Sequence, residues 1–234
     1  MWIAEADDYS APEFLASMVE RLDSRPEAGM AYCQSVIVDE TDAEVGRFPS
    51  EISGKQAEWL VDFDMAGHEV CSRYMLNQNR IVNASAVVFR KDAYDRAGGA
   101  EEAMRLCGDW LTYVKILAIS DFAYVASPYN YYRTHSRSVR KTTAVLRAAR
   151  EVAIVQSLVR AHTALTERER QLHLANFQCW STLAATDGKR LSGTNFASAL
   201  ALNIAGIKAV TRSQIVRALH QLGLLGGLRG LLGR

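Results

Sequence analysis

Acidic side chains are crowded near the start of the chain. Glu5, Asp7 and Asp8 follow the short apolar run Trp2-Ile3-Ala4. Neighbouring carboxylates repel one another, so this arrangement is costly unless a cation or another positive group lies beside it. Carboxylate oxygens suit hard divalent ions such as Mg²⁺ or Mn²⁺, and Mg²⁺ commonly shares its coordination shell with substrate phosphates. The alternative is a solvated turn whose acidic residues favour the N-terminus of a following helix.

Asp109 is a second acidic residue with a defined position. It stands immediately before Trp110 and a stretch with apolar residues at helical spacing, so a helix is expected to start here. A side chain in this place caps the unpaired N–H groups of the helix. Capping is compatible with a catalytic role at the same helix start.

One histidine follows an aromatic segment late in the mixed part of the chain. His135 comes after Tyr131-Tyr132-Arg133-Thr134, and Arg137, Arg140 and Lys141 follow it. A lone histidine is more often a surface or core residue than a ligand, and such a basic run is ordinarily a solvated loop. His135 is therefore a candidate ligand only because of its position relative to the other motifs.

The elements that must position these residues form a mixed α/β pattern. The acidic residues lie between a short strand and a helix, because Ser10 to Glu13 has the capping-box pattern and apolar residues recur on one helix face from Phe14 to Leu22. Further strands are predicted at 30–38, 83–90, 122–126 and 129–133, the last two separated by Ser127-Pro128. Helices are predicted at 55–65, at 91–97 and from Asp109 to 118.

Strand signals end near Thr142. Helices are predicted at 145–165, 167–185, 195–210 and 213–222. We therefore expect an α/β part at residues 1–141 and a helical appendage at residues 142–234. The closing residues 222–234 combine leucine and arginine with many glycines, so a frayed tail is favoured over a peripheral helix on a membrane surface.

Composition limits the classes of partner and compartment. The chain has 234 residues with 27 Lys and Arg against 26 Asp and Glu, so its charge indicates no general nucleic-acid binding. Its four cysteines are widely spaced and resemble reduced cytosolic thiols more than a zinc site or a disulfide framework. No secretory signal is visible, and the longest uncharged stretch is too polar to predict a membrane span. A cytoplasmic protein is expected, with the inner face of the membrane as an option through the tail.

Three motifs in order resemble the second half of a family 2 glycosyltransferase. They are the acidic residues from Glu5 to Asp8, the segment Gly108-Asp109-Trp110 at a helix start, and the segment from Tyr131 to His135. The segment from Asn83 to Arg90 resembles a further stretch of that family. The resemblance covers about residues 2–139 and implies part of a GT-A fold, a Rossmann-like α/β fold, in an inverting enzyme of polysaccharide biosynthesis.

The resemblance also implies roles for individual residues. Glu5 and Asp7 match the acidic ends of the DxD motif that holds a divalent metal, Mg²⁺ or Mn²⁺, and Asp8 matches a neighbour that contacts metal or sugar. Asp109 matches the general base, although Gly108 replaces the acidic residue that usually precedes it. The remaining matches are a metal ligand at His135 and substrate-binding residues at Asn83, Trp110 and Arg133.

The implied reaction transfers a sugar from a nucleotide diphosphate sugar to a glycan or lipid-linked acceptor. A metal bridging the phosphates absorbs charge that develops on the leaving group. A carboxylate takes the proton of the attacking hydroxyl, and one base without an enzyme nucleophile implies a single displacement with inversion. Arg133 and the basic residues after His135 would suit diphosphate oxygens.

The family's first half, which binds the base and ribose of the donor, is expected upstream of the acidic motif. Three explanations are open: a fragment or mis-assigned start of a longer enzyme, a second chain that supplies this half, or a non-catalytic remnant. The first is favoured, because the strand at Trp2-Ile3 would otherwise be an uncovered edge. The alternative function is an interaction module in which the acidic turn is structural.

Overall fold

The computed structural model describes residues 1–48, 56–134, 145–167 and 171. The chain divides into two compact units: Met1–Ser138 with Leu158–Ala164, and Val139–Ser157 with Leu165–Arg234. The first unit contains the sheet and every candidate site residue that the structure describes. The second contains most of helix α6 (Val145–His162), which is described here only as an element.

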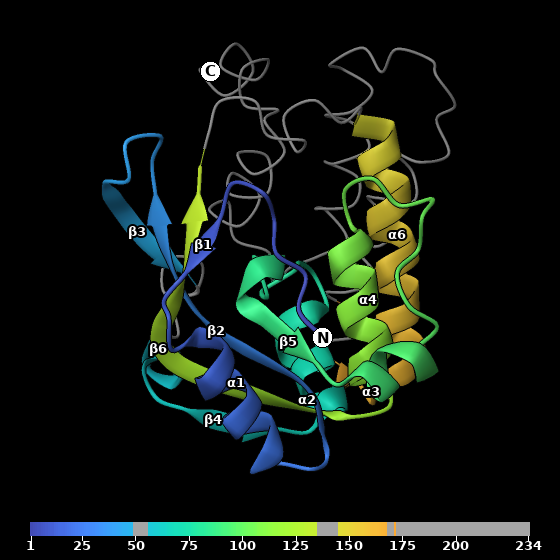
Figure 1. Cartoon of the computed structure of the whole chain (residues 1–234). Helices are drawn as coiled ribbons and strands as arrows, with labels where there is room; N and C mark the ends of the chain where they lie inside the picture. The colour runs from blue at the N-terminus through green and yellow to red at the C-terminus, as the bar shows by residue number, and fades with distance from the viewer. Residues whose placement is uncertain (49–55, 135–144, 168–170, 172–234) are drawn as a thin grey trace. The chain divides into compact units, whose positions relative to one another are not determined.

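A six-stranded sheet organises the first unit (Figure 1). The strands are β1 (Tyr9–Ser10), β2 (Ala28–Val38), β3 (Glu44–Phe48), β4 (Phe63–Met65), β5 (Val87–Phe89) and β6 (Asp121–Arg133). Their order is β1-β6-β2-β3, with β4 also on β6 and β5 also on β2. Strands β2 and β6 run parallel, and the other pairs are antiparallel. Because all eleven residues of β2 are buried, this strand lies at the centre of the core.

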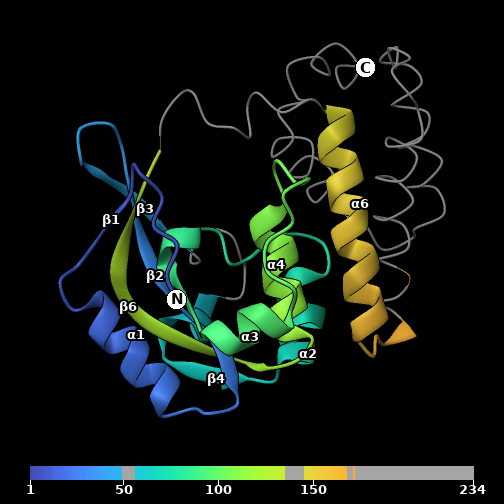
Figure 2. The ribbon, with the colours of Figure 1, turned by 45° about the vertical axis from the view of Figure 1, so that its right-hand side comes forward.

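Helices cover both sides of the curled sheet (Figure 2). Helix α1 (Phe14–Asp23) packs on β2 and β6, and α2 (Gly67–Val70), α3 (Lys91–Arg96) and α4 (Gly108–Leu117) lie on the other side. A π-helical turn, η3 (Cys71–Met75), continues α2, and the short 3₁₀ helices are η2 (Gln56–Leu60) and η4 (Ala84–Ala86). The predicted mixed α/β class is therefore confirmed at this level.

Several predicted elements are confirmed. The strand predicted at 30–38 is β2, the helix predicted at 91–97 is α3, and the helix expected from Asp109 to 118 is α4. The predicted helix 145–165 is α6. The later predicted helices and the tail lie almost entirely outside the described residues, and the division at 141/142 stays a prediction.

The predicted helix at 55–65 is wrong. Residues 56–60 form the 3₁₀ helix η2, and residues 63–65 form β4, which pairs with β6. The physical reason is aromatic packing: Trp59 is buried, its ring lies 4.8 Å from that of Tyr124, and Phe63 lies 5.0 Å from the same ring. An extended segment delivers Phe63 to these rings, which a helix would carry away from the sheet edge.

The break predicted at Ser127-Pro128 is also wrong, because β6 is one strand of thirteen residues. Pro128 falls where pairing with β2 shifts register, after the pair Cys33↔Val125 and before Ser35↔Asn130. Proline has no N–H to give to a ladder, and a bulge tolerates that loss. The proline thus marks an irregularity inside the strand and not its end.

The start of the chain differs from the predicted strand and capped helix. Trp2 forms an isolated antiparallel bridge with Val88, next to two backbone hydrogen bonds between Met1 and Phe89. Helix α1 starts at Phe14 without a side-chain cap. Ser10 instead belongs to β1, where its Oγ accepts a hydrogen bond from Asn130. The capping box is therefore not formed.

Candidate acidic site

The acidic turn between the bridge at Trp2 and strand β1 is anchored by Ser85. The Glu5 N–H donates to Ser85 Oγ at 2.9 Å, and the Trp2 indole N–H donates to the Ser85 carbonyl at 2.8 Å. The Asp8 N–H closes the turn on the Glu5 carbonyl at 3.4 Å. The turn lies at the end of the sheet where the parallel strands β2 and β6 finish, which is the end where ligands bind in open α/β sheets.

Asn83 supports the acidic turn through its contact with Ser85. Its Oδ1 accepts from the Ser85 N–H at 3.1 Å, and its Nδ2 donates to Asn130 Oδ1 at 2.5 Å. Asn130 Oδ1 also accepts from Ser35 Oγ at 3.0 Å. Asn83 is only 1% exposed, so the structure places it in a buried network and not on a surface open to substrate. The network joins β2, β6 and η4 under the acidic turn.

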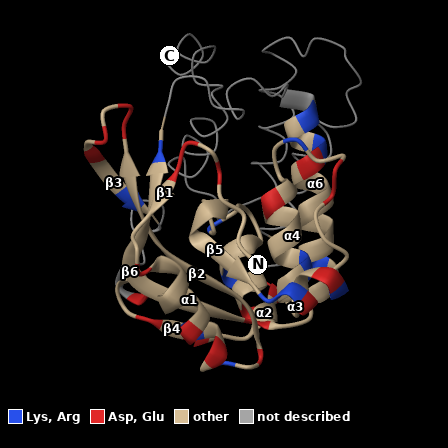
Figure 3. Ribbon diagram, in the orientation of Figure 1, with Lys and Arg blue, Asp and Glu red and all other residues tan. Residues whose placement is uncertain are grey.

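Glu5 carries the clearest electrostatic signature of the site. Removal from water by the surrounding atoms raises the pKa of Glu5, and the negative charges of Asp8, Asp109 and Asp7 raise it further. The charge of Asp109 therefore acts on Glu5, although Glu5 lies on the acidic turn and Asp109 lies on helix α4. Figure 3 shows the negative residues of the turn and of the start of α4. The site concentrates negative charge from two separate elements.

Asp8 is half-buried and only partly satisfied. Its Oδ1 accepts from the Arg133 backbone N–H at 3.0 Å, whereas its buried Oδ2 has no hydrogen-bond partner. Burial raises the pKa of Asp8, and the Arg133 N–H and the side chains of Ser85 and Asn83 oppose that rise. A buried carboxylate oxygen without a donor is costly, and it is the kind of atom that a cation or a ligand donor satisfies.

Asp109 is in the first turn of α4, after the N-cap residue Cys107. It is therefore not the N-cap that the sequence pattern predicts. Its Oδ1 accepts from the Trp110 N–H at 2.7 Å, and its Oδ2 accepts from Asn79 Nδ2 at 3.1 Å. These two donors hold the carboxylate in one orientation on the side of the acidic turn.

Trp110 and Tyr113 lie behind Asp109 in the interior. Trp110 is 4% exposed, so its ring packs in the core and does not present an open face to a sugar ring. Tyr113 is also buried, and its hydroxyl has no hydrogen-bond partner. The charges of Asp109 and Glu5 contribute to a pKa of Tyr113 well above the ordinary value, after burial as the main cause.

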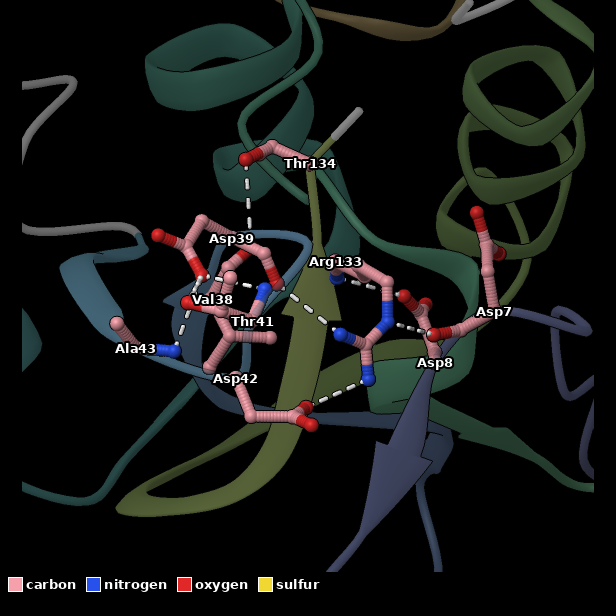
Figure 4. A network of polar contacts seen from close by, with 9 residues as sticks. All are labelled: Asp7, Asp8, Val38, Asp39, Thr41, Asp42, Ala43, Arg133 and Thr134. Atoms are coloured by element: carbon pink, nitrogen blue, oxygen red, sulfur yellow. Dashed lines mark hydrogen bonds and ion pairs between the residues drawn. The ribbon is translucent and has the colours of Figure 1, made fainter. Parts of the chain in front are cut away.

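Arg133, at the end of β6, is engaged within the chain. Its guanidinium donates to the Asp7 carbonyl, to the Asp39 carbonyl and to Asp42, as Figure 4 shows. In the same view the Asp7 carboxylate points away from the guanidinium. The structure thus brings Arg133 to the acidic turn, as the motif order predicts, but uses its donors for internal contacts.

The carboxylates of the site fit a hard divalent cation in chemistry. They are oxygen donors with mutually reinforcing negative charge, and one buried oxygen of Asp8 is unpaired. Within the described ranges, no three His, Cys, Asp or Glu side chains are grouped so as to hold a metal. His135 and the basic residues after it lie outside those ranges. An ion here would thus take few protein ligands and complete its shell with water or substrate oxygens, as Mg²⁺ commonly does.

Sequence reasoning missed the residues that support the site. Glu5 is held by Ser85, and Asn83 is held by Asn130. Asp109 is held by Asn79. Ser85 belongs to the Asn83 to Arg90 segment that the family resemblance singled out, so its motif was a usable signal. Asn79 and Asn130 have no such signal, because each makes its contact far away along the chain.

No protein-family model matches the chain, and no curated protein matches it. Among the helices of the described part, none is sufficiently long and apolar to cross a lipid bilayer. The interpretation of the acidic site therefore depends on its own geometry and on the ordered motifs.

Proposed function

We propose that this chain carries the metal and acceptor side of an inverting, nucleotide-sugar-dependent glycosyltransferase with a partial GT-A fold. The donor is a nucleotide diphosphate sugar, and the acceptor is a glycan or a lipid-linked sugar. The central parallel pair β2 and β6, with β5 antiparallel beside β2, supports this fold proposal. So does the position of the acidic turn at the ends of the parallel strands.

The observation that carries the proposal is the electrostatic interaction of Asp109 with Glu5. The negative charge of Asp109 raises the pKa of Glu5, so the turn and the start of α4 share one electrostatic environment. The motif resemblance assigns the metal to one of these elements and the general base to the other. A sugar transferase needs both next to the same anomeric carbon, and the shared electrostatic environment supports such an arrangement.

Asp109 would act as the general base. Its two oxygens accept hydrogen bonds from the Trp110 N–H and from Asn79, which fixes the orientation of the carboxylate. It would take the proton from the acceptor hydroxyl as that hydroxyl attacks the anomeric carbon. The donor's glycosidic bond breaks on the opposite side, and the nucleoside diphosphate leaves with its bonding electrons.

Glu5 and Asp7, with His135, would hold a divalent ion, and the unpaired Asp8 oxygen would contact the ion or the donor sugar. Such an ion, Mg²⁺ or Mn²⁺, neutralises charge on the departing diphosphate. The residues of the turn provide concentrated negative charge at one place, and the Ser85 contacts fix that place on the sheet.

A non-catalytic interaction module is the second candidate. The observation that favours it is that Asn83 and Arg133, both expected to bind substrate, make internal contacts. In such a module the acidic turn would be a structural feature. The exposed apolar side chains of Leu15 and Val19 on α1, at 45% and 46%, would then belong to a partner surface.

Coupled binding separates the two candidates. The chain, and a form extended through any in-frame codons upstream of Met1, are titrated with Mn²⁺ alone and with Mn²⁺ plus UDP-, GDP- or dTDP-sugars. A transferase site predicts that Mn²⁺ binds and that at least one nucleotide sugar tightens its binding. If neither form shows coupled binding, the transferase proposal fails and the interaction module is favoured.

A further inference from the structure

Arg133 connects the acidic turn to strand β6. Its backbone N–H donates to Asp8 Oδ1 at 3.0 Å, and its Nε donates to the Asp7 carbonyl at 3.0 Å. One residue therefore holds two consecutive residues of the turn, one by its carboxylate and the other by its main chain. Because β6 lies between β1 and β2, these bonds attach the turn to the interior of the sheet.

The same guanidinium reaches the turn between β2 and β3. Nη1 donates to the Asp39 carbonyl at 3.0 Å, and Nη2 forms an ion pair with Asp42 at 2.6 Å. That turn is itself ordered, because Asp39 Oδ1 accepts from the backbone N–H groups of Thr41 at 2.7 Å and Ala43 at 3.1 Å. Figure 4 shows the guanidinium between the two turns.

The aromatic ring of Tyr9 also lies beside the Arg133 guanidinium. Its ring lies 5.7 Å from the guanidinium carbon, and the ring of Tyr131 stacks on it at 4.5 Å. The Arg133 side chain is 23% exposed, and each of its three nitrogens donates to a different residue. A planar fork of five N–H donors suits this arrangement, whereas a single ammonium does not.

We propose that Arg133 is a positioning residue that fixes the acidic turn through the β2–β3 turn, and that it is not a ligand of the donor diphosphate. The inference depends on the proposed function for the identity of the ligand at the turn. It makes Asp42, an exposed residue on the β2–β3 turn, part of the support of the site. Partners that orient metal ligands typically change metal affinity about 10–100-fold when they are removed.

The test uses variants of the full chain with two measurements. Mn²⁺ affinity is measured by titration, and amide hydrogen exchange is measured on peptides that cover residues 2–11. The variants are Arg133→Ala, Arg133→Lys and Asp42→Gly. Glycine at 42 accepts the positive φ of 67° found there, so this change removes the carboxylate without new backbone strain.

The matched control is Arg47→Ala in the same hairpin, which breaks the exposed pair of Arg47 with Glu44 and leaves the Arg133 contacts in place. We expect Arg133→Ala and Asp42→Gly to weaken Mn²⁺ binding and to speed exchange at residues 2–11. Arg133→Lys should fail to restore either measurement, and Arg47→Ala should change neither. Because Asp42→Gly changes an exposed side chain, it remains informative if Arg133→Ala does not fold.

Three outcomes are distinguishable. If Asp42→Gly and the Arg133 variants leave both measurements unchanged, the positioning role is overturned. It is also overturned if Arg133→Ala weakens nucleotide-sugar binding alone while Asp42→Gly has no effect, since that pattern marks a diphosphate ligand. If neither the unaltered chain nor its extended form binds Mn²⁺, the proposed function fails, and faster exchange in the two variants still supports the role of Arg133 in holding the turn.

Discussion

Negative charge at single residues is the most distinctive property of this site. Glu5 is exposed and Asp8 is half-buried, and each has a pKa above its ordinary value. Asp8 also leaves one buried oxygen unpaired. Such groups reduce the stability of the folded chain when they are ionised, and functional sites commonly retain that cost.

Glu5→Gln should stabilise the chain at neutral pH. A carboxyl whose folded-state pKa is raised above its ordinary value of 4.5 favours folding below that value, and this contribution is lost as pH rises through the folded-state pKa. Removing the charge should therefore raise the free energy of unfolding at pH 7.5. The expected increase is only about a few tenths of a kcal/mol, because solvent screens an exposed side chain. Urea denaturation at pH 7.5 and at pH 4 measures the difference, which should shrink at the lower pH.

Glu20→Gln on α1 is the control for this change, and it should alter stability little at either pH. A loss of stability in Glu5→Gln at pH 7.5 would show that the neighbouring carboxylates do not repel Glu5. Mn²⁺ should stabilise the unaltered chain more than Glu5→Gln, because binding to the folded state alone raises its stability.

At the scale of elements, close packing of α2 against the junction of α4 and β6 sets the geometry of the helical side. A Cβ at Gly67 would lie 2.1 Å from the carbonyl oxygens of Leu117 and Ser120. Both atoms belong to the backbone, so neither can move as a flexible side chain would. Gly67 is therefore required for the close approach of these elements.

Gly67→Ala should destabilise the chain by about 1–3 kcal/mol or more, since overpacking displaces the backbone. Gly108→Ala in α4 is a matched control, because its added Cβ would meet only Met104 Cβ at 3.4 Å. Alanine favours a helix over glycine by up to about 1 kcal/mol, so the control should be neutral or stabilising. Thermal unfolding of the two variants tests the contrast, and equal melting temperatures would contradict it.

Local signals predicted the elements that local sequence determines. Strand β2 and helices α3 and α4 follow from apolar periodicity and from the glycines after Ala97. Strand β4 was missed because three residues are too few for a period, and its formation depends on the rings of Phe122 and Tyr124. The continuity of β6 through Pro128 depends on a shift in pairing with β2, which no local pattern encodes.

Residue type and order selected the acidic residues of the candidate site, Glu5, Asp7, Asp8 and Asp109, and their roles stay a prediction. The residues that support them could not be selected in this way. The sequence could not show that Trp110 is buried or that the Arg133 guanidinium contacts Asp42, because both facts depend on distant segments. Side chains chosen by type are thus placed near the site, while their roles are decided by tertiary contacts.

At the scale of the whole molecule, the cysteines report on the stability of the sheet-containing unit. Cys33, Cys71 and Cys107 are all buried. Burial raises the pKa of Cys33 and of Cys71 to about 12 in each case. Thiolate is the reactive form, so these thiols should be inert in the folded chain.

Iodoacetamide labelling at pH 8 should therefore modify these three cysteines only as fast as the unit opens. Peptide mass spectrometry distinguishes them from Cys179, which lies outside the described residues. Labelling should become complete in denaturant, and the rate should rise in Gly67→Ala. Rapid labelling of Cys33 in the native chain would contradict the buried position of β2.

The most direct test of the central claim is turnover of the nucleotide sugar that shows coupled binding, with and without Mn²⁺, in Asp109→Asn. Removal of the general base should lower turnover by about 10²–10⁴-fold while the melting temperature and Mn²⁺ affinity stay near those of the unaltered chain. Asp95→Asn, which alters an exposed pair with Lys91 on α3, should retain full turnover. Full Mn²⁺-dependent turnover in Asp109→Asn would contradict the account.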